Sequence, residues 1–310
     1  MPIRISRNGR AARLVEQGNH QSDAGNDASA QALYLQAAEV QPRWAVPWFN
    51  LGLLHKYRGE WPQSLDANLA ALARDPGHEG AIWNAAIAAT ALGQWRQARG
   101  LWRRYGIDMP DSDEPTAFSP ALTPIRVAPN GSPEVIWADR IDPARAVIRS
   151  VPTVASGRRY GDLLLHDGAP NGYRRLNGHE TPVFDELQVL TPSRYATWEL
   201  QVQHIDSEQA DALVQRLGDA DLPAENWSTG LRAMCKACSE GRPDDDAAHD
   251  HEAVDDRATD TVTLGLAMHQ HDTDAARVQM QVRALIGDLP QAVITRWECV
   301  LPVDEVGVRA

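Results

Sequence analysis

Two cysteines and two histidines in the last third of the chain have the types and spacing of a metal site. Cys235 and Cys238 form a Cys-x-x-Cys pair, and His249 and His251 follow after ten intervening residues. Two thiolates and two imidazoles suit the tetrahedral coordination of zinc, and the short loop lets both sulfurs bind one ion. The sequence therefore predicts a zinc site at these four residues.

Other interpretations of this segment stay open. Zinc-binding histidines are usually separated by three to five residues, a spacing that His249 and His251 do not have. A second His-x-His pair, His269 and His271, could replace them as zinc ligands. The run Asp244–Asp246 also suits a solvated acidic loop in which the histidines are incidental. A third interpretation is a redox-active thiol pair, although residues 239–243 are too polar and broken to predict the long helix that would lower a thiol pKa. The resulting alternative function is a zinc- or thiol-dependent regulatory protein or enzyme centred on Cys235 and Cys238.

Local catalytic signatures are absent from the sequence. It contains no Gly-x-Ser-x-Gly elbow, no phosphate-binding loop ending in Gly-Lys, and no His-Glu-x-x-His pair. It also contains no Gly-x-Gly-x-x-Gly fingerprint after a predicted strand. The sequence thus favours a non-catalytic protein.

Composition and charge narrow the class of partner. The 310 residues carry a formal net charge of −12, which argues against binding a nucleic-acid backbone, where a basic face is expected. No run approaches the ~18 consecutive apolar residues of a membrane span, and Met1–Arg13 lacks the apolar core of a signal peptide. Three cysteines do not make a disulfide framework. We therefore expect a cytoplasmic, bacterial-type protein that binds neither nucleic acid nor membrane.

The first third of the chain repeats with a period of 34 residues. Three prolines keep that spacing, Pro42, Pro76 and Pro110, and other sites fall in the same register. Those sites are Leu14, Trp48 and Ile82; Gly18, Gly52 and Ala86; Gly25, Gly59 and Gly93; Ala30, Ser64 and Ala98; and Tyr34, Asn68 and Trp102. Small sites let paired helices approach, large sites fill the gaps, and each proline stops a helix. Residues 11–112 therefore resemble the tetratricopeptide repeat (TPR) family, which has a 34-residue helix–turn–helix unit.

The resemblance implies a protein-binding groove on the first helix of each repeat. The matching positions are Ala12, Val15 and Asn19; Val46, Phe49, Asn50 and Leu53; and Trp83, Asn84 and Ile87. Partner-binding residues are accordingly expected at Phe49, Asn50, Leu53, Trp83, Asn84 and Ile87. This apolar groove favours an amphipathic helix or an extended apolar segment of a partner protein. The alternative is that Phe49 and Trp83 pack beneath the chain's own linker.

Some TPR proteins hold a partner's C-terminal carboxylate with two asparagines and three basic residues. Asn19 and Asn50 occupy the asparagine positions of this chain, but Val15, Gly80 and Asn84 occupy the basic ones. A carboxylate clamp is therefore not expected.

Beyond the repeats, the pattern predicts three further segments. Residues 110–133 contain six prolines and are predicted to be a linker, followed by a small antiparallel β sheet or barrel over 134–190. Asn171–Gly172 and Asn177–Gly178 predict tight hairpin turns within it. Over 195–302, two βα units and a closing strand indicate an α+β, ferredoxin-like domain with the acidic Cys/His segment, 231–260, as an insertion. The predicted fold is thus multidomain, with all-α repeats followed by these two domains.

The last repeat lacks a predicted capping helix. Its second helix carries Trp95, Leu101, Trp102 and Tyr105, a large apolar surface to leave exposed. We expect either the β domain to cover this helix or two chains to associate through the last repeat.

Overall fold

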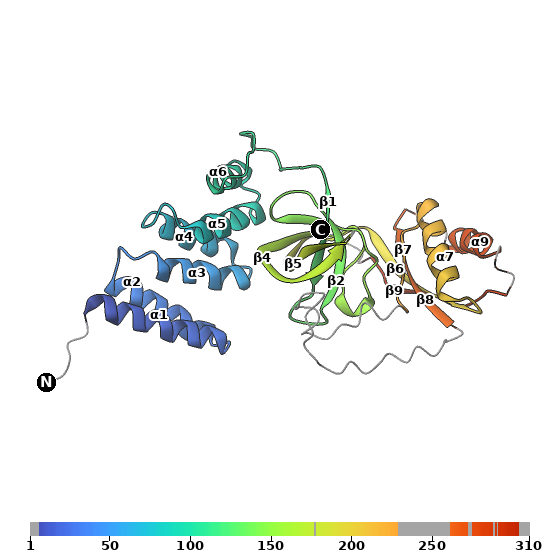
Figure 1. The fold of residues 1–310 in the computed structure, drawn as a ribbon, viewed down its shortest axis with the longest axis horizontal. Helices are drawn as coiled ribbons and strands as arrows, with labels where there is room; N and C mark the ends of the chain where they lie inside the picture. Colours follow the sequence, from blue (N-terminus) through green and yellow to red (C-terminus); the bar gives the residue numbers. More distant parts are fainter. Residues whose placement is uncertain are drawn as a thin grey trace, which may run out of the picture. The chain divides into compact units, whose positions relative to one another are not determined.

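The structure, a computed structural model, divides into two compact units, Met1–Ala117 and Phe118–Ala310 (Figure 1). It describes residues 6–176, 178–228, 261–271, 275–287, 289 and 291–303. The predicted zinc ligands Cys235, Cys238, His249 and His251 lie outside the described residues.

The first unit contains three antiparallel helix pairs, which confirms the predicted repeats. Its helices are α1 (Arg7–Asp23), α2 (Asp27–Val40), α3 (Val46–Tyr57), α4 (Trp61–Leu72), α5 (Glu79–Ala91) and α6 (Trp95–Tyr105). Each pair turns at a glycine with positive φ, +74° at Gly25, +69° at Gly59 and +66° at Gly93. This conformation favours glycine because a Cβ would be strained there.

A second glycine position explains how the paired helices come into contact. A Cβ on Gly18 would lie 2.5 Å from the Tyr34 ring, and one on Gly52 would lie 2.3 Å from the Asn68 amide nitrogen. Asn68, at a site where the repeat usually has a large apolar residue, is fully buried. Its Nδ2 donates to the Ser64 carbonyl at 2.8 Å, and Ser64 Oγ donates to the Gly52 carbonyl at 2.8 Å. The hydrogen-bonded side chains of Asn68 and Ser64 thus occupy the position that a large apolar side chain usually fills.

An extended segment, not a helix, follows the last repeat within the first unit. Buried Arg99 on α6 donates to the carbonyls of Pro110, Glu114 and Pro115 at 3.0–3.2 Å. Arg96 forms ion pairs with Asp111 and Asp113 on the same segment. These contacts hold residues 110–115 against α6, while Tyr105 on that helix remains 41% exposed.

The second unit begins with a closed five-stranded barrel that includes part of the predicted linker. Its strands are β1 (Ala121–Val127), β2 (Glu134–Arg140), β3 (Arg145–Ile148), β4 (Leu163–Leu176) and β5 (His179–Thr191), with a short 3-10 helix at Val154–Ser156. Neighbouring strands are antiparallel, except that β1 closes the barrel on β5 in parallel. Interpreting all of 110–133 as linker was therefore wrong, because 121–127 is a strand.

Pro124 shows why the proline-rich sequence concealed β1. Pro124 pairs with Trp137 on β2, but the N–H and C=O groups of Trp137 point away from β1. The Trp137 N–H donates to Ser150 Oγ, and its carbonyl accepts from the N–H groups of Arg149 and Ser150. On its other side β1 pairs with β5 only from Ile125 onward. The missing N–H of Pro124 therefore costs the sheet no ladder hydrogen bond.

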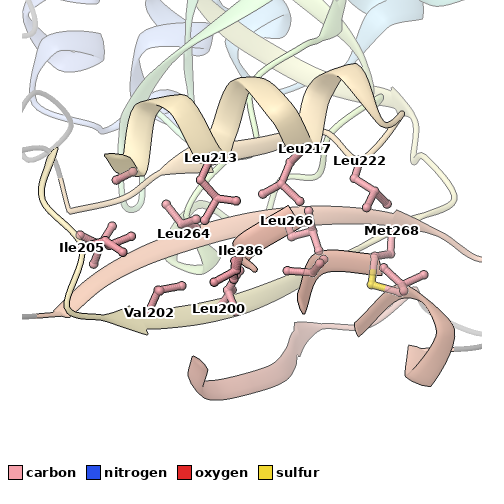
Figure 2. Packing of buried hydrophobic residues seen from close by; sticks show 14 residues of the cluster. Leu200, Val202, Ile205, Leu213, Leu217, Leu222, Leu264, Leu266, Met268 and Ile286 are labelled. Carbon is pink, nitrogen blue, oxygen red and sulfur yellow. The ribbon is translucent and has the colours of Figure 1, made fainter. Parts of the chain in front are cut away.

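The described residues in the remainder of the second unit form a four-stranded antiparallel sheet covered by two helices. The elements are β6 (Tyr195–Gln203), α7 (Ser207–Asp219), β7 (Ala224–Asn226), β8 (Thr261–His269), α9 (Ala275–Ile286) and β9 (Val293–Leu301), and the strand order is β7-β8-β6-β9. Asp206 caps α7 with Gln209 in a capping box, as its position before the helix predicts. Figure 2 shows Leu213 and Leu217 of α7 facing Leu264 and Leu266 of β8, and all four are fully buried.

Within the described part of the chain, no helix is long and apolar enough to cross a membrane.

Candidate functional site

The first helices of the three repeats, α1, α3 and α5, lie next to one another in order. Their spacing, their turn glycines and their close contacts with the second helices define the architecture. Residues 7–105 are tetratricopeptide-type repeats. The candidate site is therefore built on these three helices, where the sequence placed it.

Exposure separates the predicted binding residues into two groups. Phe49, Asn50 and Leu53 of α3 are half-buried. On α5, by contrast, Asn84 is only 5% exposed and Ile87 is fully buried. Trp83 on the same helix is half-buried like the α3 residues, so the accessible part of the predicted groove lies mainly, not wholly, on α1 and α3. We call Asn19, Phe49, Asn50 and Leu53 the inner surface.

Two asparagine amides meet at the inner surface. Asn50 Nδ2 donates to Asn19 Oδ1 at 2.9 Å, and the Tyr34 hydroxyl on α2 donates to the same oxygen at 2.9 Å. Tyr34 is buried, and burial raises its pKa, with the charge of Asp23 adding to the effect. The phenol therefore stays a neutral donor that fixes the orientation of the Asn19 side chain, and Asn19 is an exposed residue.

Phe49, the residue before Asn50, packs against the start of α5. Its ring lies 4.5 Å from the His78 ring, centroid to centroid, with the planes tilted by 34°. A Cβ added to Gly80 would lie only 3.0 Å from the Phe49 ring. A basic side chain at position 80 would therefore displace Phe49, which gives a physical reason for glycine there.

Trp83 and Asn84 make contacts that the sequence did not indicate. The Trp83 ring packs edge-on against Trp102 at 4.8 Å and Tyr105 at 4.6 Å, so it faces α6. Asn84 Oδ1 accepts a hydrogen bond from Lys56 Nζ at 3.3 Å in a buried position. Both residues stabilise the packing of the repeats in this arrangement. Lys56 carries no sequence signal for this role, because its partner lies one repeat away.

The second His-x-His pair, His269 and His271, lies within the described residues. The His269 and His271 rings are 4.9 Å apart, and the His271 backbone N–H donates to His269 Nδ1 at 3.3 Å. The described residues contain no cluster of three or more His, Cys, Asp or Glu side chains that could hold a metal ion. The zinc site stays a prediction.

Comparisons with solved structures give matches over about a third of the chain. No family model and no curated protein matches the sequence. Among solved structures, the second TPR domain of Spaghetti (RPAP3), bound to the HSP90 peptide SRMEEVD, shares 16% identity, covering 32% of this chain and 91% of that one, with a TM-score of 0.31. The Arabidopsis OM64 TPR domain shares 16% identity over 32% of this chain and 83% of its own, with a TM-score of 0.31. Yeast Tom70 shares 20% identity over 32% of this chain and 20% of its own, also with a TM-score of 0.31.

Proposed function

We propose that this protein is a non-catalytic interaction module whose inner surface binds an extended, largely apolar segment of a partner protein. The observation that carries the proposal is the Asn19–Asn50 amide pair, held by Tyr34, with the half-buried Phe49 and Leu53 on the same helix as Asn50. Side-chain amides offer both donors and acceptors, so they can pair with a peptide backbone of any sequence. The neighbouring apolar side chains then favour apolar residues in the bound segment.

The residues around the amide pair also argue for the class of ligand. A C-terminal carboxylate would need basic groups at positions 15, 80 and 84, where this chain has Val15, Gly80 and Asn84. Val15 is buried, and Phe49 occupies the space beside Gly80. An internal apolar segment of a protein therefore fits this surface better than an acidic C-terminal tail.

The test starts with affinity capture by the full chain, followed by titration of the captured partner segment. Phe49→Ala and Asn50→Ala should each weaken binding about tenfold or more, because truncating a residue that dominates an interface costs about 2 kcal/mol or more. The matched control is Leu35→Ala on α2, a similarly apolar side chain that is 43% exposed outside the inner surface. Equal affinities for the control and both inner-surface variants, all folded, would show that the partner binds elsewhere.

We interpret the C-terminal sheet and its two helices as the ferredoxin-like domain expected from the sequence. The element order β6-α7-β7-β8-α9-β9 and the antiparallel strand order β7-β8-β6-β9 support this interpretation. It assigns no activity by itself, because this architecture hosts many functions.

A further inference from the structure

Strand β9 forms a long edge of the C-terminal sheet. It is last in the order β7-β8-β6-β9 and spans nine residues, whereas β7 at the other edge spans three. All nine β9 residues are at least partly exposed. Among the described residues, no strand pairs with the outer side of β9. An edge of this length offers unpaired backbone groups to another strand.

The sequence of β9 is chemically symmetric about its central residue, Trp297. When the strand is placed antiparallel to a copy of itself with Trp297 opposite Trp297, each residue meets one of matching chemistry. The pairs are Val293 with Leu301, Ile294 with Val300, Thr295 with Cys299, and Arg296 with Glu298. Apolar residues face apolar residues, and the two opposite charges face each other twice.

The charges also select this register over its neighbours. Centring the pair on Arg296 would place two arginines opposite each other, and centring it on Glu298 would place two glutamates opposite each other. Like charges directly opposite are destabilising in a sheet, whereas opposite charges contribute favourably. The same charges discourage pairing with unrelated strands.

The geometry of β9 suits a ladder centred on Trp297. Relative to β6, β9 has register shifts near Thr295 and Val300, and the stretch between them, 296–299, pairs without interruption. Arg296 and Glu298 lie on one face, 41% and 58% exposed, and within the chain Arg296 already contacts Glu298 at 2.6 Å and Glu199 at 2.8 Å. The guanidinium is thus held on the exposed face of the edge strand, within reach of a second strand.

We infer that two copies of this chain associate through β9, forming a two-fold antiparallel ladder that joins their C-terminal sheets into one. Each Arg296 then lies opposite the Glu298 of the other copy. This self-association is separate from the inner surface of the repeats, so partner binding and dimer formation can be tested independently.

Charge reversal in the full chain tests the inference by sedimentation velocity and light scattering. The wild type should have twice the mass of the 34.1 kDa chain. Arg296→Glu places glutamates opposite glutamates, and Glu298→Arg places arginines opposite arginines, so each variant alone should be monomeric. Mixed in equal amounts, the two variants restore opposite charges at both positions and should form a heterodimer. Arg283→Glu, an exposed position on α9 with the same change of charge, is the control and should remain dimeric.

Several outcomes would overturn the inference. A wild type that is monomeric at high protein concentration would do so directly. A dimer that persists in both charge-reversal variants would place the interface elsewhere. Two folded, monomeric variants that fail to associate when mixed would show that the Arg296–Glu298 pairing is not the contact.

Discussion

Acidification should destabilise the barrel through one buried histidine, His166. This residue lies on β4 and is fully buried, with Nδ1 2.7 Å from the Asp167 carbonyl oxygen. Its ring centroid lies 5.4 Å from that of Phe184, and Nε2 is buried without a hydrogen-bond partner. The neutral ring therefore donates from Nδ1, and a proton on Nε2 would have nowhere to donate.

The charged groups around His166 do not compensate a positive imidazole. The positive charge of Arg140 on β2 disfavours protonation of His166. Glu186 on β5 is the register partner of His166, but it already forms an ion pair with Arg158 at 2.6 Å. Only Asp167 favours the charged form, through its backbone carbonyl and its carboxylate. Burial dominates and lowers the pKa of His166 from 6.5 to about 4.

The size and sign of the effect follow from linkage. The folded pKa lies below the unfolded one, so the unfolded chain binds the proton first as pH falls. The stabilisation is complete above the unfolded pKa of 6.5 and is lost progressively as pH falls through about 4. A shift of this size corresponds to about 3 kcal/mol in the free energy of unfolding.

The assay combines an NMR titration of the His166 imidazole with urea unfolding at pH 7 and at pH 4. The control is His166→Asn, whose amide can still donate to Asp167 but does not titrate. The wild type should lose about 3 kcal/mol more than this variant between the two pH values, since carboxylate effects are common to both. Parallel pH dependences, or an imidazole titrating near its ordinary pKa in the folded protein, would refute the reasoning.

Three further predictions concern other parts of the chain. Gly52→Ala should lower the free energy of unfolding, measured by chemical denaturation, by about 1–3 kcal/mol, because the new Cβ would clash with the hydrogen-bonded Asn68 amide. The control is Gly77→Ala, whose Cβ would have its nearest contact at 3.7 Å and which should be nearly neutral. Arg99→Met should keep the apolar stem but lose the hydrogen bonds to three carbonyls, which should lower the free energy of unfolding by about 1.5–3 kcal/mol. Residues 110–115 should then become sensitive to limited proteolysis, and protection equal to that of the wild type would contradict the role assigned to Arg99. Protein purified without added metal should contain about one equivalent of zinc, and Cys235→Ser with Cys238→Ser should remove it; a metal content near zero in the wild type would favour the solvated acidic loop.

The sequence determined the helical repeats because their code is local. A 34-residue period repeats small, large and glycine sites at fixed offsets, and each site acts on a helix within its own unit or the next. Gly18 and Gly52 were identified as close contacts in this way, and the structure places them against Tyr34 and Asn68. The strand and helix pattern after residue 195 is local in the same sense, as the capping box at Asp206 shows.

Tertiary structure decided the features that depend on partners distant in the sequence. Pro124 indicates a linker in the sequence, but its pairing with β2 and the start of the β5 pairing at Ile125 mean that the sheet needs no hydrogen bond from its missing N–H. Asn171–Gly172 is predicted to form a hairpin turn, but strand β4 continues through both residues. The positive φ of Gly172 coincides with a register irregularity between β4 and β5. Trp83 is predicted from the sequence as a groove residue, and in the structure its half-buried ring also packs against Trp102 and Tyr105 of α6. In each case the residue type permits two environments, and contacts formed only on folding select between them.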